Sequence, residues 1–202
     1  MSSTPPMSPP AVPARKRLAK ADRQRQLLDA ARDIVRSQGT DALTLGWLAE
    51  RAGVTKPVVY DHFGSRTGLL GMLYAAYDAQ QNALMDDALR SAGRSLPAVA
   101  RVIAAAYVQC VVAMGQDLPG ISAALAGSPE LDALKKTHEE AFLRKCQAAL
   151  QPFARQPLGR AAMRALLGTA EAVSFAAAAG EIAPDDAEAE IRDAILRIAR
   201  RT

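Results

Sequence analysis

The segment TLGWLAERAGVTKPVVYDHFGSR, residues 44–66, constrains the fold more than any other part of the chain. Thr44 can accept a hydrogen bond from an amide in the first turn of a helix, so a short helix is expected over Leu45–Arg51. Gly53 can adopt the positive φ that ends a helix and turns the chain within about three residues. The segment therefore predicts one short helix followed by a tight turn.

A second helix is expected to begin at Thr55 and to end near Phe63. Pro57 would lie in its first turn, where a missing N–H costs little, and Gly64 would stop it. Val59 and Phe63 are four residues apart, so they share a face that can pack on the first helix. Together the two helices predict a helix-turn-helix. The side chains left facing away from its core are Lys56, Val58, Tyr60 and His62.

DNA binding explains these outward-facing residues, because a helix of this length fits the major groove with its N-terminal residues toward the base edges. The free amides at the helix N-terminus favour a phosphate, and Lys56 can reach a phosphate or a guanine edge. A Tyr60 hydroxyl can donate to another phosphate, and Val58 can touch a thymine methyl. The alternative is a plain helical hairpin within a larger bundle, which needs neither exposed Lys56 and Tyr60 nor a basic segment ahead of it.

At these residues the chain resembles the TetR family of bacterial transcriptional repressors. The family pattern is a capping Thr, an Ala-Gly-Val-Thr/Ser turn, a Tyr-x-His-Phe run, a basic residue and paired leucines. Here the pattern is matched by Thr44, Ala52–Thr55, Tyr60–Phe63, Arg66 and Leu69–Leu70. Arg66 replaces the usual Lys and keeps its charge, and Trp47 is a bulky residue beside the aliphatic position. The resemblance does not extend into the rest of the chain.

The resemblance implies a role for each matching position. It implies contacts to the DNA backbone for Thr44, Thr55, Tyr60, His62 and Arg66. It implies base contacts for Lys56, Pro57 and Val58. It also implies a homodimer that binds a palindromic operator in double-stranded DNA, and a body with a pocket for a small-molecule effector.

The N-terminal region is unlike the rest of the chain in composition. Residues 1–13 hold five of the 12 prolines and no charged side chain, which predicts a disordered arm. Beside a helix-turn-helix, the basic side chains that follow are expected to add phosphate contacts, although a solvated tail is the alternative. They are Arg15, Lys16, Arg17, Lys20, Arg23 and Arg25.

A helix over Asp22–Gln38 would complete a three-helix head. Charge separates this head from the rest of the chain: residues 1–67 carry 11 Lys and Arg against six Asp and Glu, whereas residues 68–202 carry 14 against 15. We therefore predict an all-α protein, with a disordered basic arm (1–20), a helix-turn-helix domain (21–67) and a helical body for effector binding and dimerisation (68–202).

In the body, the apolar residues recur at helical spacing and nowhere alternate as in a strand, so only helices are predicted. A helix striped by Leu69, Leu73, Tyr77 and Leu84 would join the head to the body, and motion of this helix would change the spacing of two heads in a dimer. Further helices are expected over Pro97–Met114, Ile121–Ala126, Ser128–Leu150, Leu158–Ala179 and from Pro184 to the C-terminus.

The last two of these helices are expected to form a four-helix dimer interface, because the apolar face of the final helix, with Ile191, Ile195 and Ile198, needs a cover. Packing within one chain is the alternative. The most apolar window, Val102–Met114, is about half of a membrane crossing, so no membrane partner is expected.

No signal-peptide pattern precedes the two cysteines, Cys110 and Cys146, so a cytoplasmic protein with reduced thiols is expected. No cofactor, metal site or catalytic constellation is expected, since His138 has no Asp, Glu, Cys or second His at coordinating spacing and His62 belongs to the head. We therefore expect no enzyme. Lys135–Glu139 and Lys136–Glu140 are interpreted as pairs on a solvated face.

Inward-facing residues with polar or polarisable groups are the candidates for effector contacts, and ordinary packing is the alternative for each of them. Few aromatic residues and little buried charge favour a lipophilic effector with one or two polar groups. Glu171 could hold a cation or face water. The candidates are Tyr107, Gln109, Cys110, Met114, His138, Phe142, Glu171, Ser174 and Phe175.

Three functions remain open from the sequence. The first is a ligand-released repressor that binds an inverted repeat as a homodimer. The second is a DNA-binding regulator without a small ligand, controlled by a partner protein or constitutive. The third is a helical ligand-binding or catalytic protein whose head no longer binds DNA.

Overall fold

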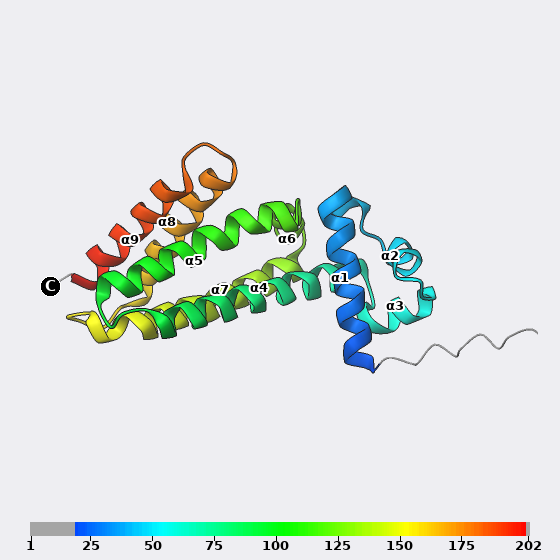
Figure 1. Cartoon of the computed structure of the whole chain (residues 1–202), viewed down its shortest axis with the longest axis horizontal. Helices are drawn as coiled ribbons and strands as arrows, with labels where there is room; N and C mark the ends of the chain where they lie inside the picture. The colour runs from blue at the N-terminus through cyan, green and yellow to red at the C-terminus, as the bar shows by residue number, and fades with distance from the viewer. Residues whose placement is uncertain (1–18, 201–202) are drawn as a thin grey trace, which may run out of the picture.

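The computed structural model describes residues 19–200, and within this range the chain is helical and contains no strand. The expected all-α fold with an N-terminal helix-turn-helix is confirmed. The segments 1–13 and Arg15–Arg17, for which disorder and DNA contacts were predicted, lie outside the described residues. Figure 1 shows a small head at one end of an elongated body, with the C-terminal helices far from the head.

The head consists of α1 (Lys20–Gln38), a 3₁₀ turn (Thr40–Ala42), α2 (Leu45–Ala52) and α3 (Lys56–Phe63). The body consists of α4 (Arg66–Ser91), α5 (Leu96–Asp117), α6 (Ile121–Ala126), α7 (Pro129–Leu150), a 3₁₀ turn (Gln151–Phe153), α8 (Arg160–Ala178) and α9 (Pro184–Arg200). In Figure 1, α4 and α7 run side by side along the body, and α8 and α9 lie beyond α5.

The turn between α2 and α3 forms as its residue types predict. The Thr44 hydroxyl accepts a hydrogen bond from the Trp47 amide at 3.1 Å, which caps α2. Gly53 then takes φ 64° and ψ 38°, a left-handed conformation that costs other residues free energy. Thr55 stands at the N-cap position of α3, but its side chain caps no amide.

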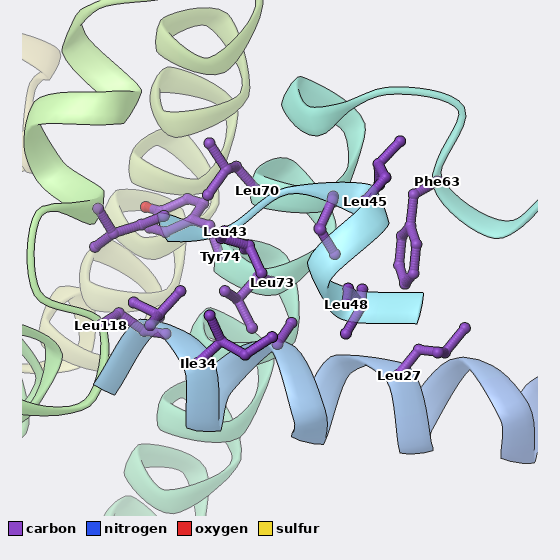
Figure 2. Packing of buried hydrophobic residues seen from close by; sticks show 14 of the residues in the cluster. Leu27, Ile34, Leu43, Leu45, Leu48, Phe63, Leu70, Leu73, Tyr74 and Leu118 are labelled. Atoms are coloured by element: carbon purple, nitrogen blue, oxygen red, sulfur yellow. The ribbon is translucent and has the colours of Figure 1, made fainter. Parts of the chain in front are cut away.

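The first hydrophobic core joins the head to the near end of the body. Figure 2 shows Ile34 of α1 and Leu48 of α2 in one cluster with Leu73 and Tyr74 of α4 and Leu118 from the end of α5. All of them are buried. This core therefore extends across the predicted boundary at residue 67, and α4 packs with both parts.

A glycine lies at one tight contact between the head and the body. Gly120, between α5 and α6, has φ 81°, and a Cβ built on it would lie 2.5 Å from Oγ1 of Thr40. Thr40 is itself buried, in the turn after α1. Gly120 therefore packs against the Thr40 side chain in a place that leaves no room for a Cβ.

A second core is built from α5, α7, α8 and α9 and contains the C-terminal helices. Ile191 and Ile195 are buried and Ile198 is half-buried within the subunit, because α9 packs on both α5 and α8. For this face of α9 the alternative, packing within one chain, is the observed arrangement, and a dimer interface formed by the last two helices stays a prediction. The face is covered intramolecularly.

Two predictions about the long helices also need correction. At 22 residues, α5 exceeds the predicted window and reaches membrane-spanning length with a suitable composition, yet it packs against α4, α7, α8 and α9. Leu84, expected on the buried stripe of α4, is 56% exposed, and its neighbour Met85 is buried instead. Seven residues are only about 20° short of two full turns, so helical spacing alone does not separate Leu84 from Tyr77. The packing of the second core against this end of α4 buries Met85 instead.

Candidate nucleic-acid interface and ligand cavity

The outer face of α3 carries the side chains that sequence analysis assigned to DNA. Thr55, Lys56 and Pro57 are exposed at its N-terminus, and Tyr60 is 53% exposed one turn later. Val59 is fully buried on the opposite face, which fixes the rotation of the helix. This arrangement presents a hydroxyl, an ammonium and a phenol on one short helix, as a major-groove helix requires.

The remaining head positions are less accessible. Val58 and His62 are half-buried, and the His62 ring lies 6.0 Å from the Phe63 ring. Thr44 is exposed, although its hydroxyl already accepts the capping hydrogen bond. Trp47, which the sequence interpretation noted only as a departure, is 37% exposed on α2. The DNA roles of all these residues stay predictions.

The Arg66 guanidinium is hydrogen-bonded to the backbone of the head. Its Nε donates to the Leu43 carbonyl oxygen at 2.9 Å, and its Nη2 donates to the Thr40 carbonyl oxygen at 2.6 Å. Asp41 lies 3.8 Å from the same guanidinium. These bonds satisfy carbonyls that end the turn after α1. Arg66 thus has a structural role in the head, and its contact with phosphate stays a prediction.

The predicted basic arm overlaps α1, because α1 begins at Lys20. Lys20 lies 3.5 Å from Asp61 of α3, in an exposed ion pair. Arg25 pairs with Asp22, and Arg23 donates to Gln26 at 2.6 Å. The cations of this first helical segment are thus partly matched by neighbours on the protein.

The body contains a cavity of about 780 Å³, including the part open to solvent, between α4, α5, α7 and α8. Its walls are mainly apolar and aromatic, which is typical of a small-molecule site. Seven of the nine predicted effector residues line it: Tyr107, Cys110, Met114, His138, Phe142, Glu171 and Phe175.

The other two predicted residues lie elsewhere. Gln109 is exposed, in a shallow depression with Leu84 between α4 and α5. Ser174 is fully buried behind the cavity wall, and within the described residues its hydroxyl has no hydrogen-bond partner. Neighbouring positions on a helix point about 100° apart, so the apolar character of both helices could not reveal which side faces the cavity. Neither Gln109 nor Ser174 lines the cavity.

One wall of the cavity, where α7 meets α4, carries polar contacts that the sequence analysis did not predict. Nδ1 of His138 lies 2.6 Å from Oδ2 of Asp78 on α4, and Asn82 donates to the same oxygen at 3.0 Å. The Tyr74 ring meets the His138 ring edge-on at 5.4 Å. Asp78 follows Tyr74 by four residues, so both lie on the same face of α4. The partner of Asp78, His138, is 60 residues away in the chain, so helical spacing could not reveal the contact.

Lys135 forms the second link across this wall. It pairs with Glu139 on α7 and with Glu171 on α8, 2.9 Å away. Burial alone lowers the pKa of Lys135, but the two carboxylates outweigh it, and the net pKa is raised above its ordinary value. The Lys135–Glu139 pair was interpreted as a solvated face. It instead lines the cavity, because α8 brings Glu171 against it.

The neighbouring pair outside the cavity also differs from the prediction. Lys136 pairs with Asp132 at 2.6 Å and not with Glu140. Glu140 instead lies 3.3 Å from Arg164 and 3.8 Å from Arg160, both on α8. These contacts between α7 and α8 are exposed, so they contribute little stability.

Burial keeps the cavity tyrosines and cysteine protonated. The pKa of Tyr107 is raised first by burial and then by the carboxylates Glu171 and Glu139. The pKa of Tyr74 is raised by burial and then by Asp78. Burial, with a contribution from Asp78, raises the pKa of Cys110 to about 11. At neutral pH these groups therefore present neutral hydroxyls and a thiol.

A hydrogen bond between two cavity residues links their helices. The Tyr77 hydroxyl donates to the Cys110 carbonyl oxygen at 2.7 Å, which links α4 to α5. Among the described residues, no group of three or more His, Cys, Asp and Glu side chains is arranged to hold a metal ion.

Comparisons with known proteins agree with this architecture. Residues 27–73 match the family described as bacterial regulatory proteins, tetR family. FasR, an HTH-type transcriptional activator from Mycolicibacterium smegmatis, is 43% identical over 53 residues, which are 26% of this chain and 24% of FasR. SrpR, an HTH-type transcriptional regulator from Pseudomonas putida, is 40% identical over 72 residues, or 35% of this chain and 32% of SrpR. These matches span only a quarter to a third of either relative.

Solved structures extend the likeness to the body. A TetR-family transcriptional regulator from Rhodococcus sp. superposes with a TM-score of 0.70 at 18% identity, covering 88% of this chain and 99% of that one. The fatty acid degradation regulator FadR from Bacillus halodurans gives a TM-score of 0.66 at 16% identity, covering 88% and 94%. At such identities the likeness establishes the fold. The head therefore matches the tetR family of bacterial regulatory proteins over residues 27–73, and the whole chain has the fold of solved TetR-family regulators.

Proposed function

We propose that the protein is a transcriptional repressor that binds a palindromic operator in double-stranded DNA as a homodimer and leaves it when a small molecule fills the cavity. The observation that carries this proposal is the continuity of α4. The helix begins beside α3 and lines the cavity with Tyr74 and Tyr77, which also belong to the core of the head. A ligand that shifts α4 therefore shifts the head.

Release requires two arrangements of the heads, one of which fits successive major grooves. A ligand that favours the released arrangement by about 3–5 kcal/mol is sufficient to change operator occupancy. The contact of Gly120 with Thr40 supplies a second connection, since α6 and the end of α5 press on the turn after α1. The cavity is the feature that favours this function over a regulator without a small ligand.

The surface of α8 supports a homodimer. Small residues recur on it at helical spacing, and Phe175 is 42% exposed at the end of the same helix. Small side chains allow a second helix to approach closely, and the exposed ring gives apolar area to bury. The exposed small residues are Ala161, Ala165, Gly168 and Ala172. The proposed function also places the protein in the cytoplasm, where a bacterial operator lies.

Selection of bound duplexes from random-sequence DNA, with ligand-free protein, tests the DNA function. We expect an inverted repeat with half-site centres about 10–20 bp apart, as a dimer with two recognition helices requires. Tyr60→Ala should reduce enrichment strongly, and Tyr60→Phe, which keeps the ring but not the hydroxyl, should separate phosphate bonding from packing. Binding that depends on salt but selects no sequence would contradict the proposal.

A further inference from the structure

The cavity wall carries more negative charge than positive charge. Three carboxylates line it, those of Asp78, Glu139 and Glu171, whereas Lys135 is its one ammonium group and His138 its one imidazole. The carboxylates remain in excess even if His138 is protonated. This excess contradicts the expectation that buried charge would be scarce.

The positively charged side chains at the cavity already have carboxylate partners. Lys135 contacts both Glu139 and Glu171, and Arg164, behind the wall, lies 3.7 Å from Glu139. A ligand carboxylate would have to break the Lys135 pairs and approach the other acids. The existing contacts therefore disfavour an anion.

Two carboxylate oxygens remain available. The side-chain hydrogen bonds of Asp78 use Oδ2 and that of Glu171 uses Oε1, so among the described residues Oδ1 of Asp78 and Oε2 of Glu171 accept no hydrogen bond. The side chains are only 23% and 30% exposed. Partly buried carboxylates with a free oxygen favour a positive partner.

Aromatic rings complete the environment. Tyr107 and Phe142 lie with ring centroids 5.3 Å apart, and Phe175 and Tyr74 line the same cavity. Aromatic faces attract cations and also accept apolar groups. We propose that the cavity takes an amphipathic organic cation, with its positive group at Asp78 and Glu171 and its apolar body against Tyr107, Phe142 and Phe175. The inference rests on the proposed function in taking this cavity as the effector site.

Three probes with one naphthylethyl body distinguish the charge classes. One carries a trimethylammonium group, one the isosteric tert-butyl group, and one a carboxylate of similar size. Titration calorimetry with full-length protein, without DNA, should show the ammonium probe binding at least about tenfold more tightly than the neutral isostere, and the carboxylate binding most weakly. Because a quaternary ammonium donates no hydrogen bond, the difference isolates charge.

Substitution of single carboxylates tests where the positive group of the probe binds. Asp78→Asn and Glu171→Gln are each expected to weaken the ammonium probe roughly threefold to tenfold while leaving the tert-butyl probe nearly unchanged. Glu181→Gln removes the same charge from an exposed position after α8 and should change neither affinity. Circular dichroism and thermal unfolding identify a variant that fails to fold, and the second carboxylate variant then provides the test.

Equal affinities for the three probes, preference for the carboxylate, or no binding of the ammonium probe would each overturn the inference. Operator binding by ligand-free protein is measured separately. A protein that selects an operator but ignores the cation keeps its proposed DNA function and loses this ligand class. A protein that binds the cation but selects no DNA sequence loses the proposed function and keeps the charge preference of its cavity.

Discussion

The head presents its candidate functional side chains on its outer surface, whereas the body presents them toward an internal cavity. In the head, Val59 is buried while Lys56 and Tyr60 face outward from the same helix. In the body, Asp78 and Glu171 face inward, toward a cavity enclosed by four helices. The first arrangement depends on one short segment, and the second on contacts between residues far apart in the chain. The two regions should therefore respond differently to substitution.

The largest effect is expected from Leu48→Ala, because Leu48 is fully buried between α2 and the rest of the head. The loss of packing should lower the free energy of unfolding by about 2–5 kcal/mol, measured by denaturant titration. Leu84→Ala is the matched control on the exposed side of α4, with an expected change within about 0.5 kcal/mol. Similar losses in both variants would contradict the assigned burial.

Gly120→Ala tests whether the two regions act as one. Its positive φ and the nearby Thr40 hydroxyl make a Cβ strained, so the free energy of unfolding should fall by about 1–3 kcal/mol. The response of operator binding to ligand should weaken as well. Gly115→Ala has no neighbour within 4 Å of its Cβ, and it should be neutral or slightly stabilising. If neither the free energy of unfolding nor the ligand response changes in Gly120→Ala, head and body are not coupled through this contact.

Arg66→Ala distinguishes support of the head from contact with DNA. Loss of its two bonds to backbone carbonyls should cost about 1–2 kcal/mol of stability, a reduced figure because the side chain is 43% exposed. Thermal unfolding measures this change. If stability is unaffected while operator affinity falls steeply, Arg66 contacts phosphate after all.

Tyr60→Ala is expected to have the smallest effect on folding. Its exposed ring supports little packing, so the unfolding midpoint should stay within the error of the wild-type value. Operator affinity, measured by fluorescence anisotropy at fixed salt, should drop roughly tenfold through the loss of one phosphate contact and its packing. A destabilised Tyr60→Ala protein would mean that α3 is held by its outer face.

Local chemistry made the head predictable. The capping by Thr44, the left-handed Gly53 and the burial of Val59 and Phe63 each depend on residues within one or two helical turns. Local reasoning did not reveal the hydrogen bonds of Arg66, because its acceptors at Leu43 and Thr40 are 23 and 26 residues away. A motif can indicate that a position is basic, but not which oxygen its guanidinium meets.

The amino-acid sequence by itself determined the all-α class, the helix-turn-helix and the inward-facing character of most cavity residues, since these follow from helical periodicity and turn chemistry. Only the tertiary structure decided that α9 is covered within its own subunit, that Gln109 and Ser174 miss the cavity, and that Lys135 lies inside it with Glu171. Periodicity defines the face of a helix, whereas the partner of that face depends on how distant helices cross. The charge of the cavity could therefore not be foreseen from any one helix.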